Sequence, residues 1–96
     1  MRKNNTQTIG AVLREVLRQE GLETPLNQHR LVDAWPEVMG RQISKYTGNI
    51  FIQNQTLHVQ IRSSVLRQEL AMGRAQLVRR LNEHVGAQVI TDIRFY

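Results

Sequence analysis

The stretch TLHVQIRSSVLRQELAMGRAQLVRRL, residues 56–81, changes its hydrophobic period partway along. Apolar and polar residues first alternate, which is typical of a strand with one buried face, and apolar residues then recur every three or four positions, which predicts an amphipathic helix. The alternating residues are Leu57, Val59 and Ile61, and the helical stripe is Leu66, Leu70, Gly73, Leu77 and Leu81. Ser63 and Ser64 lie where the period changes, and either hydroxyl is suited to cap the helix.

Two helices are expected before this stretch. The first runs from about Thr8 to Glu20 on an apolar stripe, and Gly21 suits the left-handed position that ends it. The second begins near Thr24–Pro25, with threonine as N-cap and proline at the first helical position. At Pro36 this second helix is expected to end or kink, or a new turn is expected to start, because proline lacks an N–H and clashes with the preceding turn.

Two further strands complete the expected sheet. Ile50–Gln53 forms the first strand, and Asn54–Gln55 is a two-residue hairpin connection to the alternating stretch. The residues from Val89 to Phe95 alternate again and form the last strand. The order α-α-β-β-α-β predicts an α+β fold, with a three-stranded sheet and helices packed on one face.

We predict a single domain over residues 8–96 after a flexible leader at residues 1–7. A chain of this length buries roughly two-thirds of its unfolded surface, which is enough for one core. Gly73 lies in the helical stripe, where glycine costs about 1 kcal/mol relative to alanine, so we expect close packing on the sheet to require it. The expected core consists of Trp35, Leu57, Val59, Ile61, Leu66, Leu70, Leu77, Leu81 and Ile93.

The charge of the chain favours an anionic partner. Thirteen basic residues against eight acidic ones give a formal net charge of +5, and eleven of the basic residues are arginine. Arginine presents a planar fork of donors that matches phosphate, and a small basic domain is typical of nucleic-acid binding. We expect non-specific phosphate contacts from Arg41, Lys45, Arg62, Arg67 and Arg74. Base stacking is expected to be minor, because few aromatic residues lie outside the core.

The sequence lacks the motifs of a catalytic or metal-binding protein. It has no cysteine, and His29, His58 and His84 do not have the spacing of metal ligands. It has neither a glycine-rich phosphate loop nor a serine-nucleophile motif. We therefore predict no metal, no cofactor, no small-molecule substrate and no enzymatic activity. No apolar run approaches ~18 residues and no hydrophobic signal segment follows the start, so a cytoplasmic protein away from the membrane is expected.

Several single residues and short segments of this chain occur in a characteristic order and spacing. They are Trp35, Val38-Met39-Gly40, Ile43, Tyr46-Thr47, Leu57, Val59, Ser63-Ser64, Glu69-Leu70, Leu81-Asn82, Gly86 and the run from Val89 to Phe95. In these residues the chain resembles the DciA family of bacterial replicative-helicase loaders, from about residue 9 to residue 95. It has Leu66 where family members often carry tryptophan. The resemblance implies a fold similar to a K-homology domain, DNA binding, and contact with a DnaB-type replicative helicase. Together with the charge, it leads us to expect non-specific binding of single- or double-stranded DNA.

One element of true K-homology domains is missing. Their G-x-x-G loop clamps the backbone of RNA, whereas the corresponding Gly73-Arg74-Ala75-Gln76 has one glycine. The resemblance thus predicts a non-enzymatic adaptor that assists loading of the replicative helicase. An RNA-binding K-homology-like module and a protein-interaction domain with a basic surface stay open as alternatives. Exposed aromatic residues on the sheet would favour the RNA module, and Phe51 and Tyr96 are the candidates.

Overall fold

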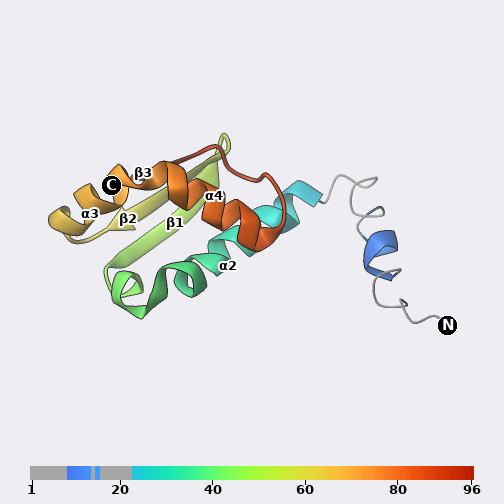
Figure 1. Ribbon diagram of the computed structural model, residues 1–96, viewed down its shortest axis with the longest axis horizontal. Coiled ribbons are helices and arrows are strands. Elements are labelled where there is room, and N and C mark those ends of the chain that lie inside the picture. The colour runs from blue at the N-terminus through green and yellow to red at the C-terminus, as the bar shows by residue number, and fades with distance from the viewer. Residues whose placement is uncertain (1–8, 14, 16–22) are drawn as a thin grey trace.

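The computed structural model of the chain describes residues 9–13, 15 and 23–96 (Figure 1). Its labelled elements are α2 (Glu23–Ser44), β1 (Thr47–Gln53), β2 (Thr56–Ile61), α3 (Ser64–Met72), α4 (Arg74–Val85) and β3 (Asp92–Phe95). Residues 9–13 and 15 are helical. The rest of the predicted helix from Thr8 to Glu20, its terminator Gly21 and the predicted leader at residues 1–7 lie outside the described residues.

The three strands form one mixed sheet in the order β1-β2-β3. β1 and β2 are antiparallel, whereas β2 and β3 are parallel and are joined through α3 and α4. Asn54 and Gln55 have φ angles of 53° and 62°, so both residues of the hairpin turn are left-handed, as the twist of adjacent strands favours. The predicted α+β class and three-stranded sheet are confirmed, and the likeness to a K-homology domain stays a prediction.

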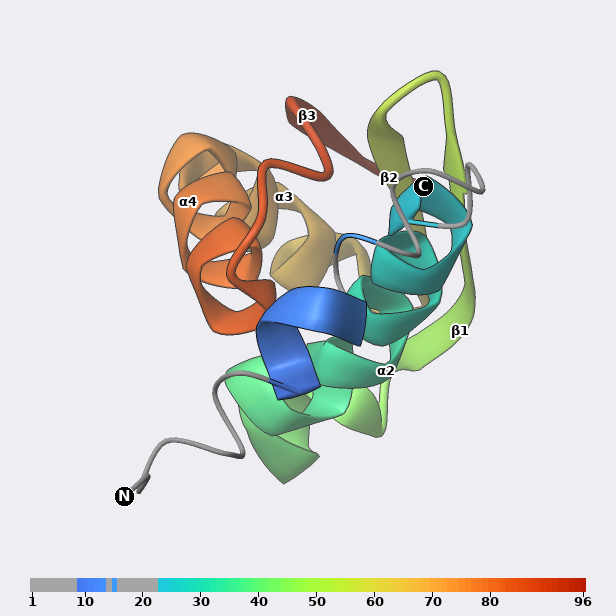
Figure 2. The ribbon, with the colours of Figure 1, turned by 90° about the vertical axis from the view of Figure 1, so that its right-hand side faces the viewer.

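The helices lie on one side of the sheet (Figure 2). α2 packs on β1, α3 on β2 and β3, and α4 on β3, and α2 and α4 pack on each other. The core between these layers contains Trp35, Leu57, Val59, Ile61, Leu70, Leu77, Leu81 and Ile93, all buried, and Leu66 packs against it partly buried. Leu31 and Ile90, which are also fully buried, complete it.

Trp35 anchors α2 in this core. Its ring packs against Phe95 with a centroid distance of 6.2 Å, and its Nε1 donates a hydrogen bond to Thr47 Oγ1 at 3.1 Å. The buried indole N–H therefore has the partner that burial of a polar group requires. This arrangement fixes the start of β1 against the helix that precedes it.

Of the outcomes predicted at Pro36, an end of the second helix does not occur. α2 continues through Pro36, and Gly40, with φ 88° and ψ 172°, is the residue of α2 with non-helical dihedral angles. Proline in a helix interior costs about 3 kcal/mol. Here Trp35 is buried on one side of Pro36 and Val38 packs against the core on the other, so burial of the helix face offsets that cost.

The predicted close packing at Gly73 is also wrong. Gly73 separates α3 from α4, and a methyl group at this position would meet no atom within 4 Å. The apolar stripe nevertheless continues across the break, since Leu70 and Leu77 are both buried. The predicted cap is confirmed, because Ser63 Oγ accepts a hydrogen bond from Leu66 N at 3.2 Å.

The segment between α4 and β3 is held by one buried side chain. Asn82 Oδ1 accepts hydrogen bonds from Val89 N at 2.9 Å and from Ile90 N at 3.1 Å, and Asn82 Nδ2 donates to Ile90 O at 2.9 Å. These bonds occupy backbone groups that a neighbouring strand would otherwise use. β3 consequently begins at Asp92, three residues later than the alternation predicts.

Candidate nucleic acid interface

One face of the sheet is not covered by the described helices. On β2 the alternation that buries Leu57, Val59 and Ile61 turns the residues between them outward. The strand register places Phe51 of β1 opposite His58 of β2, and His58 opposite Arg94 of β3. Side chains from all three strands thus form one row across the uncovered face.

Phe51 and His58 stack on each other within that row. Their ring centroids are 4.7 Å apart and the rings are inclined by 9°, which is nearly parallel. Phe51 is 42% exposed and lies on β1, which is an edge strand of the sheet formed by the described residues. The pair therefore presents aromatic surface to solvent beside the arginine of the same row.

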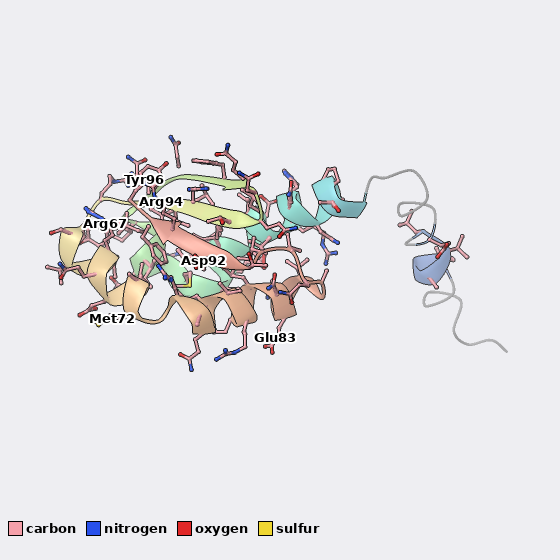
Figure 3. All side chains as sticks on the ribbon, turned by 90° about the horizontal axis from the view of Figure 1, so that it is seen from above. Arg67, Met72, Glu83, Asp92, Arg94 and Tyr96 are labelled. Atoms are coloured by element: carbon pink, nitrogen blue, oxygen red, sulfur yellow. The ribbon has the colours of Figure 1, made fainter. Side chains whose placement is uncertain are left out.

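Tyr96 adds a second aromatic ring in the neighbouring row. Tyr96 N donates to Val59 O at 3.0 Å and Ile61 N donates to Tyr96 O at 2.8 Å, so Tyr96 continues the ladder beside Gln60. Tyr96 is 39% exposed. Arg67 of α3, Arg94 and Tyr96 lie together toward one end of β3, and Asp92 lies toward its other end (Figure 3).

The first strand is adapted to the Gln60 side chain. The ladder between β1 and β2 shifts register between Thr47 and Ile50, and Asn49 N within this bulge donates to Gln60 Oε1 at 3.0 Å. A methyl group on Gly48 would overlap the Gln60 amide. Glycine at this position therefore leaves room for the end of the Gln60 side chain, and it does not serve a positive φ angle.

Three of the five predicted phosphate-binding residues come together beyond the end of β2. Arg62 Nη2 donates to Lys45 O at 2.8 Å, which brings these two residues into contact. Lys45 N in turn donates to Arg41 O at 3.1 Å, so Arg41 lies one turn earlier. We call Arg41, Lys45 and Arg62 the basic end; all three side chains are exposed.

The other two predicted residues have different surroundings. Arg67 is partly buried, and its Nε is shielded from solvent and has no hydrogen-bond partner among the described residues. Arg74 Nε lies 3.3 Å from Asp92 Oδ1, and both side chains are about half exposed, so this arginine has a carboxylate partner. An ion pair exposed to water contributes little to stability, but it lowers the charge that Arg74 offers to a phosphate.

Sequence reasoning missed two members of the uncovered face. His58 was considered only as a possible metal ligand, and Arg94 was not singled out. The alternation around Ile93 already turns Arg94 away from the core. The parallel register that places Arg94 beside His58 joins residues far apart in the chain and has no local signature in the sequence.

The described residues contain no cluster of three or more histidine, cysteine or carboxylate side chains able to hold a metal ion. Across residues 9–13, 15 and 23–96, no helix combines the length and apolar character of a bilayer span. The strands carry one carboxylate, Asp92, which is the partner of Arg74. Together these features describe a small α+β domain with a helix-covered sheet face and an uncovered face that is polar, aromatic and basic.

The chain belongs to the DciA family, whose model, described as "Dna[CI] antecedent, DciA", matches residues 8–95. It is similar to a UPF0232 protein of Streptomyces avermitilis, with 30% identity over 81% of this chain and 44% of that protein. A UPF0232 protein of Corynebacterium glutamicum is 23% identical over 94% of this chain and 51% of its own length. A third, from Mycolicibacterium paratuberculosis, is 25% identical over 92% of this chain and 49% of its own length. The chain therefore spans about half the length of these curated relatives.

Proposed function

We propose that this chain is a non-enzymatic, DNA-binding adaptor of the bacterial cytoplasm that assists loading of a DnaB-type replicative helicase. The match to the DciA family over residues 8–95 is the observation that carries the proposal. The sequence has no glycine-rich phosphate loop, so the adaptor acts without hydrolysing ATP itself.

The basic end supplies the non-specific part of DNA binding in this proposal. Arg41, Lys45 and Arg62 are exposed and adjacent, and each neutralises phosphate charge when DNA is bound. Arg74 contributes less, because Asp92 lies beside it. Counterion release then makes the affinity fall as salt rises, with a slope of about −0.7 per contact for single strands and −0.9 for duplex DNA.

A pull-down from nuclease-treated bacterial lysate tests the role in helicase loading. The full chain is expected to recover the replicative helicase and to increase helicase loading onto a DNA bubble. Recovery of ribosomal particles that disappear on RNase treatment, without the helicase, would contradict the proposal. That outcome would favour an RNA-binding module, which the exposed rings of Phe51 and Tyr96 on the sheet also suit.

A charge-matched pair of variants tests the basic end. Replacing Arg41, Lys45 and Arg62 together by glutamine is expected to reduce the steepness of the salt dependence by about 2 for single-stranded DNA, at about 0.7 per contact. The control replaces Arg30, Arg79 and Arg80 by glutamine, which removes the same charge from exposed positions on α2 and α4. Equal changes in the two variants would show that overall charge, and not the basic end, determines binding.

A further inference from the structure

We infer that the uncovered face of the sheet is a site for single-stranded DNA, on which unpaired bases stack against the Phe51–His58 pair and against Tyr96. The identity of the strand as DNA rests on the proposed function, whereas the residues and the binding mode come from the sheet itself. This site binds bases, whereas the basic end binds phosphates, and Arg62 lies where the two meet. The inference departs from the expectation that base stacking is minor, because Phe51 and Tyr96 are both exposed on the sheet.

The geometry of the Phe51–His58 pair leaves aromatic surface for a ligand. In a pair of rings inclined by 9° with centroids 4.7 Å apart, each ring uses one of its two faces. Phe51 lies on an edge strand and stays 42% exposed, so the pairing with His58 does not remove it from water. Every base has a flat π face, and such faces stack on aromatic side chains without regard to sequence.

The charges around the rings match a nucleic-acid strand. Arg94 occupies the same row as the stacked pair, and Arg62 follows β2 at the end where Tyr96 completes the ladder. The carboxylate of the strands, Asp92, lies beside Arg74, so it does not repel phosphate with its full charge. Cations therefore flank aromatic rings across the face, which is the arrangement that single-stranded nucleic-acid sites use.

The same geometry selects single strands over duplexes. The bases of a duplex are stacked on one another and paired, so their flat faces are not available to Phe51 or Tyr96 unless the duplex opens. Phosphate contacts at the basic end do not make this distinction. Preference for unpaired bases is thus the property that separates the sheet face from the rest of the basic surface.

Binding of fluorescent DNA oligonucleotides to the full chain tests the inference through a matched pair of variants. Phe51→Leu keeps an apolar side chain but removes the ring, and we expect it to weaken binding of single-stranded DNA by at least about fivefold, the lower end for loss of one stacked base. The control Met72→Leu changes an apolar side chain on α3 that is 83% exposed, and it should leave the affinity unchanged. Phe51→Tyr should restore binding, because it restores the ring.

The second half of the test changes the ligand. An oligonucleotide with the same phosphates but without bases should bind the unaltered protein more weakly than normal DNA binds Phe51→Leu, because it also loses stacking on Tyr96. Phe51→Leu should not weaken binding of this oligonucleotide further. Duplex DNA should likewise be insensitive to Phe51→Leu. The proposed site would be overturned if the unaltered protein and Phe51→Leu bound single-stranded DNA with equal affinity, provided that thermal unfolding curves show both proteins to be folded in the assay. If RNA of the same sequence bound more tightly than DNA, the assignment of DNA as the ligand of the uncovered face would be wrong.

These outcomes are separable from failure of the proposed function. If Phe51→Leu loses single-stranded binding but the unaltered chain recovers no helicase, the base-stacking site stands and the adaptor role fails. If the unaltered chain recovers and loads the helicase while Phe51→Leu binds single strands normally, the adaptor role stands and the site fails.

Discussion

The two faces of β2 belong to the same six residues but have opposite surroundings. Leu57, Val59 and Ile61 are at most 2% exposed beneath the helices, whereas His58 and Gln60 lie between them on the uncovered face. The covered face is constrained by packing, so changes there alter the stability of the fold. The uncovered face is free of that constraint and can carry arginine and exposed rings for binding. Stability and the proposed binding should therefore be separable by substitutions one residue apart.

The sharpest form of this comparison uses Leu57→Ala and His58→Ala. Leu57 has no exposed surface, so its truncation should reduce the free energy of unfolding by about 2–5 kcal/mol. His58→Ala removes the cross-strand pair with Phe51, which should reduce the free energy of unfolding by less than about 1 kcal/mol. Denaturant unfolding of the two variants measures both values. A loss for His58→Ala as large as that for Leu57→Ala would mean that the uncovered face also holds the fold together.

Asn82 tests whether a polar group can matter as much as the apolar core. Asn82→Ala should reduce stability by about 2 kcal/mol, because buried Ile90 and partly buried Val89 lose backbone hydrogen-bond partners. Gln76→Ala on the exposed side of α4 is the control and should change stability by less than about 0.5 kcal/mol. Similar unfolding midpoints for the two variants would contradict the role of Asn82 in holding the segment before β3.

A substitution at Gly48 tests how much stability is lost when a side chain of the uncovered face is displaced. Gly48→Ala should cost about 0.5–1.5 kcal/mol, since the new methyl group displaces the Gln60 amide from its hydrogen bond with Asn49 N. The displaced group is the end of a flexible side chain, which keeps the cost small. In a Gln60→Ala background the same substitution should cost less, and a double-mutant cycle of unfolding free energies measures the difference. Additive effects would show that the two positions do not interact.

The smallest expected effect is a gain of stability. Gly73→Ala should stabilise the protein by about 0.4–1 kcal/mol, because φ −105° is accessible to alanine and the added methyl group would meet no neighbouring side chain or strand within 4 Å. Alanine also reduces the conformational freedom of the unfolded chain. The melting temperature measures this gain. A loss of stability would restore the interpretation that Gly73 is needed for close packing.

Much of the covered face could be predicted from the sequence, because local periods describe it. The alternation at residues 56–61, the cap at Ser63 and the turn at Asn54–Gln55 each depend on near neighbours in the chain. The break at Gly73 could not be predicted, since the apolar stripe continues across it. The start of β3 was misplaced for a different reason, because a side chain in α4 takes the backbone N–H groups of Val89 and Ile90.

The candidate site was less predictable than the fold. The composition favoured an anionic partner. It could not predict that Arg41, Lys45 and Arg62 lie together beyond one end of β2, or that Arg74 lies beside Asp92. Those relations depend on which segments meet in space. The row formed by Phe51, His58 and Arg94 depends in addition on a parallel register that no turn specifies.

The parallel pairing of β2 with β3 also bears on the order in which the protein folds. The β1–β2 hairpin closes through two turn residues, whereas Thr56 meets Asp92 only after the whole α3–α4 crossover is in place. Local hairpins form in about 1–10 μs, and non-local strand pairing is intrinsically slower. Phe51 and His58 would thus be paired early, and Arg94 and Tyr96 would join them last. A ligand that needs all four residues binds the completed fold and not its intermediates, and such a ligand raises the melting temperature with the logarithm of its concentration once that concentration exceeds the dissociation constant.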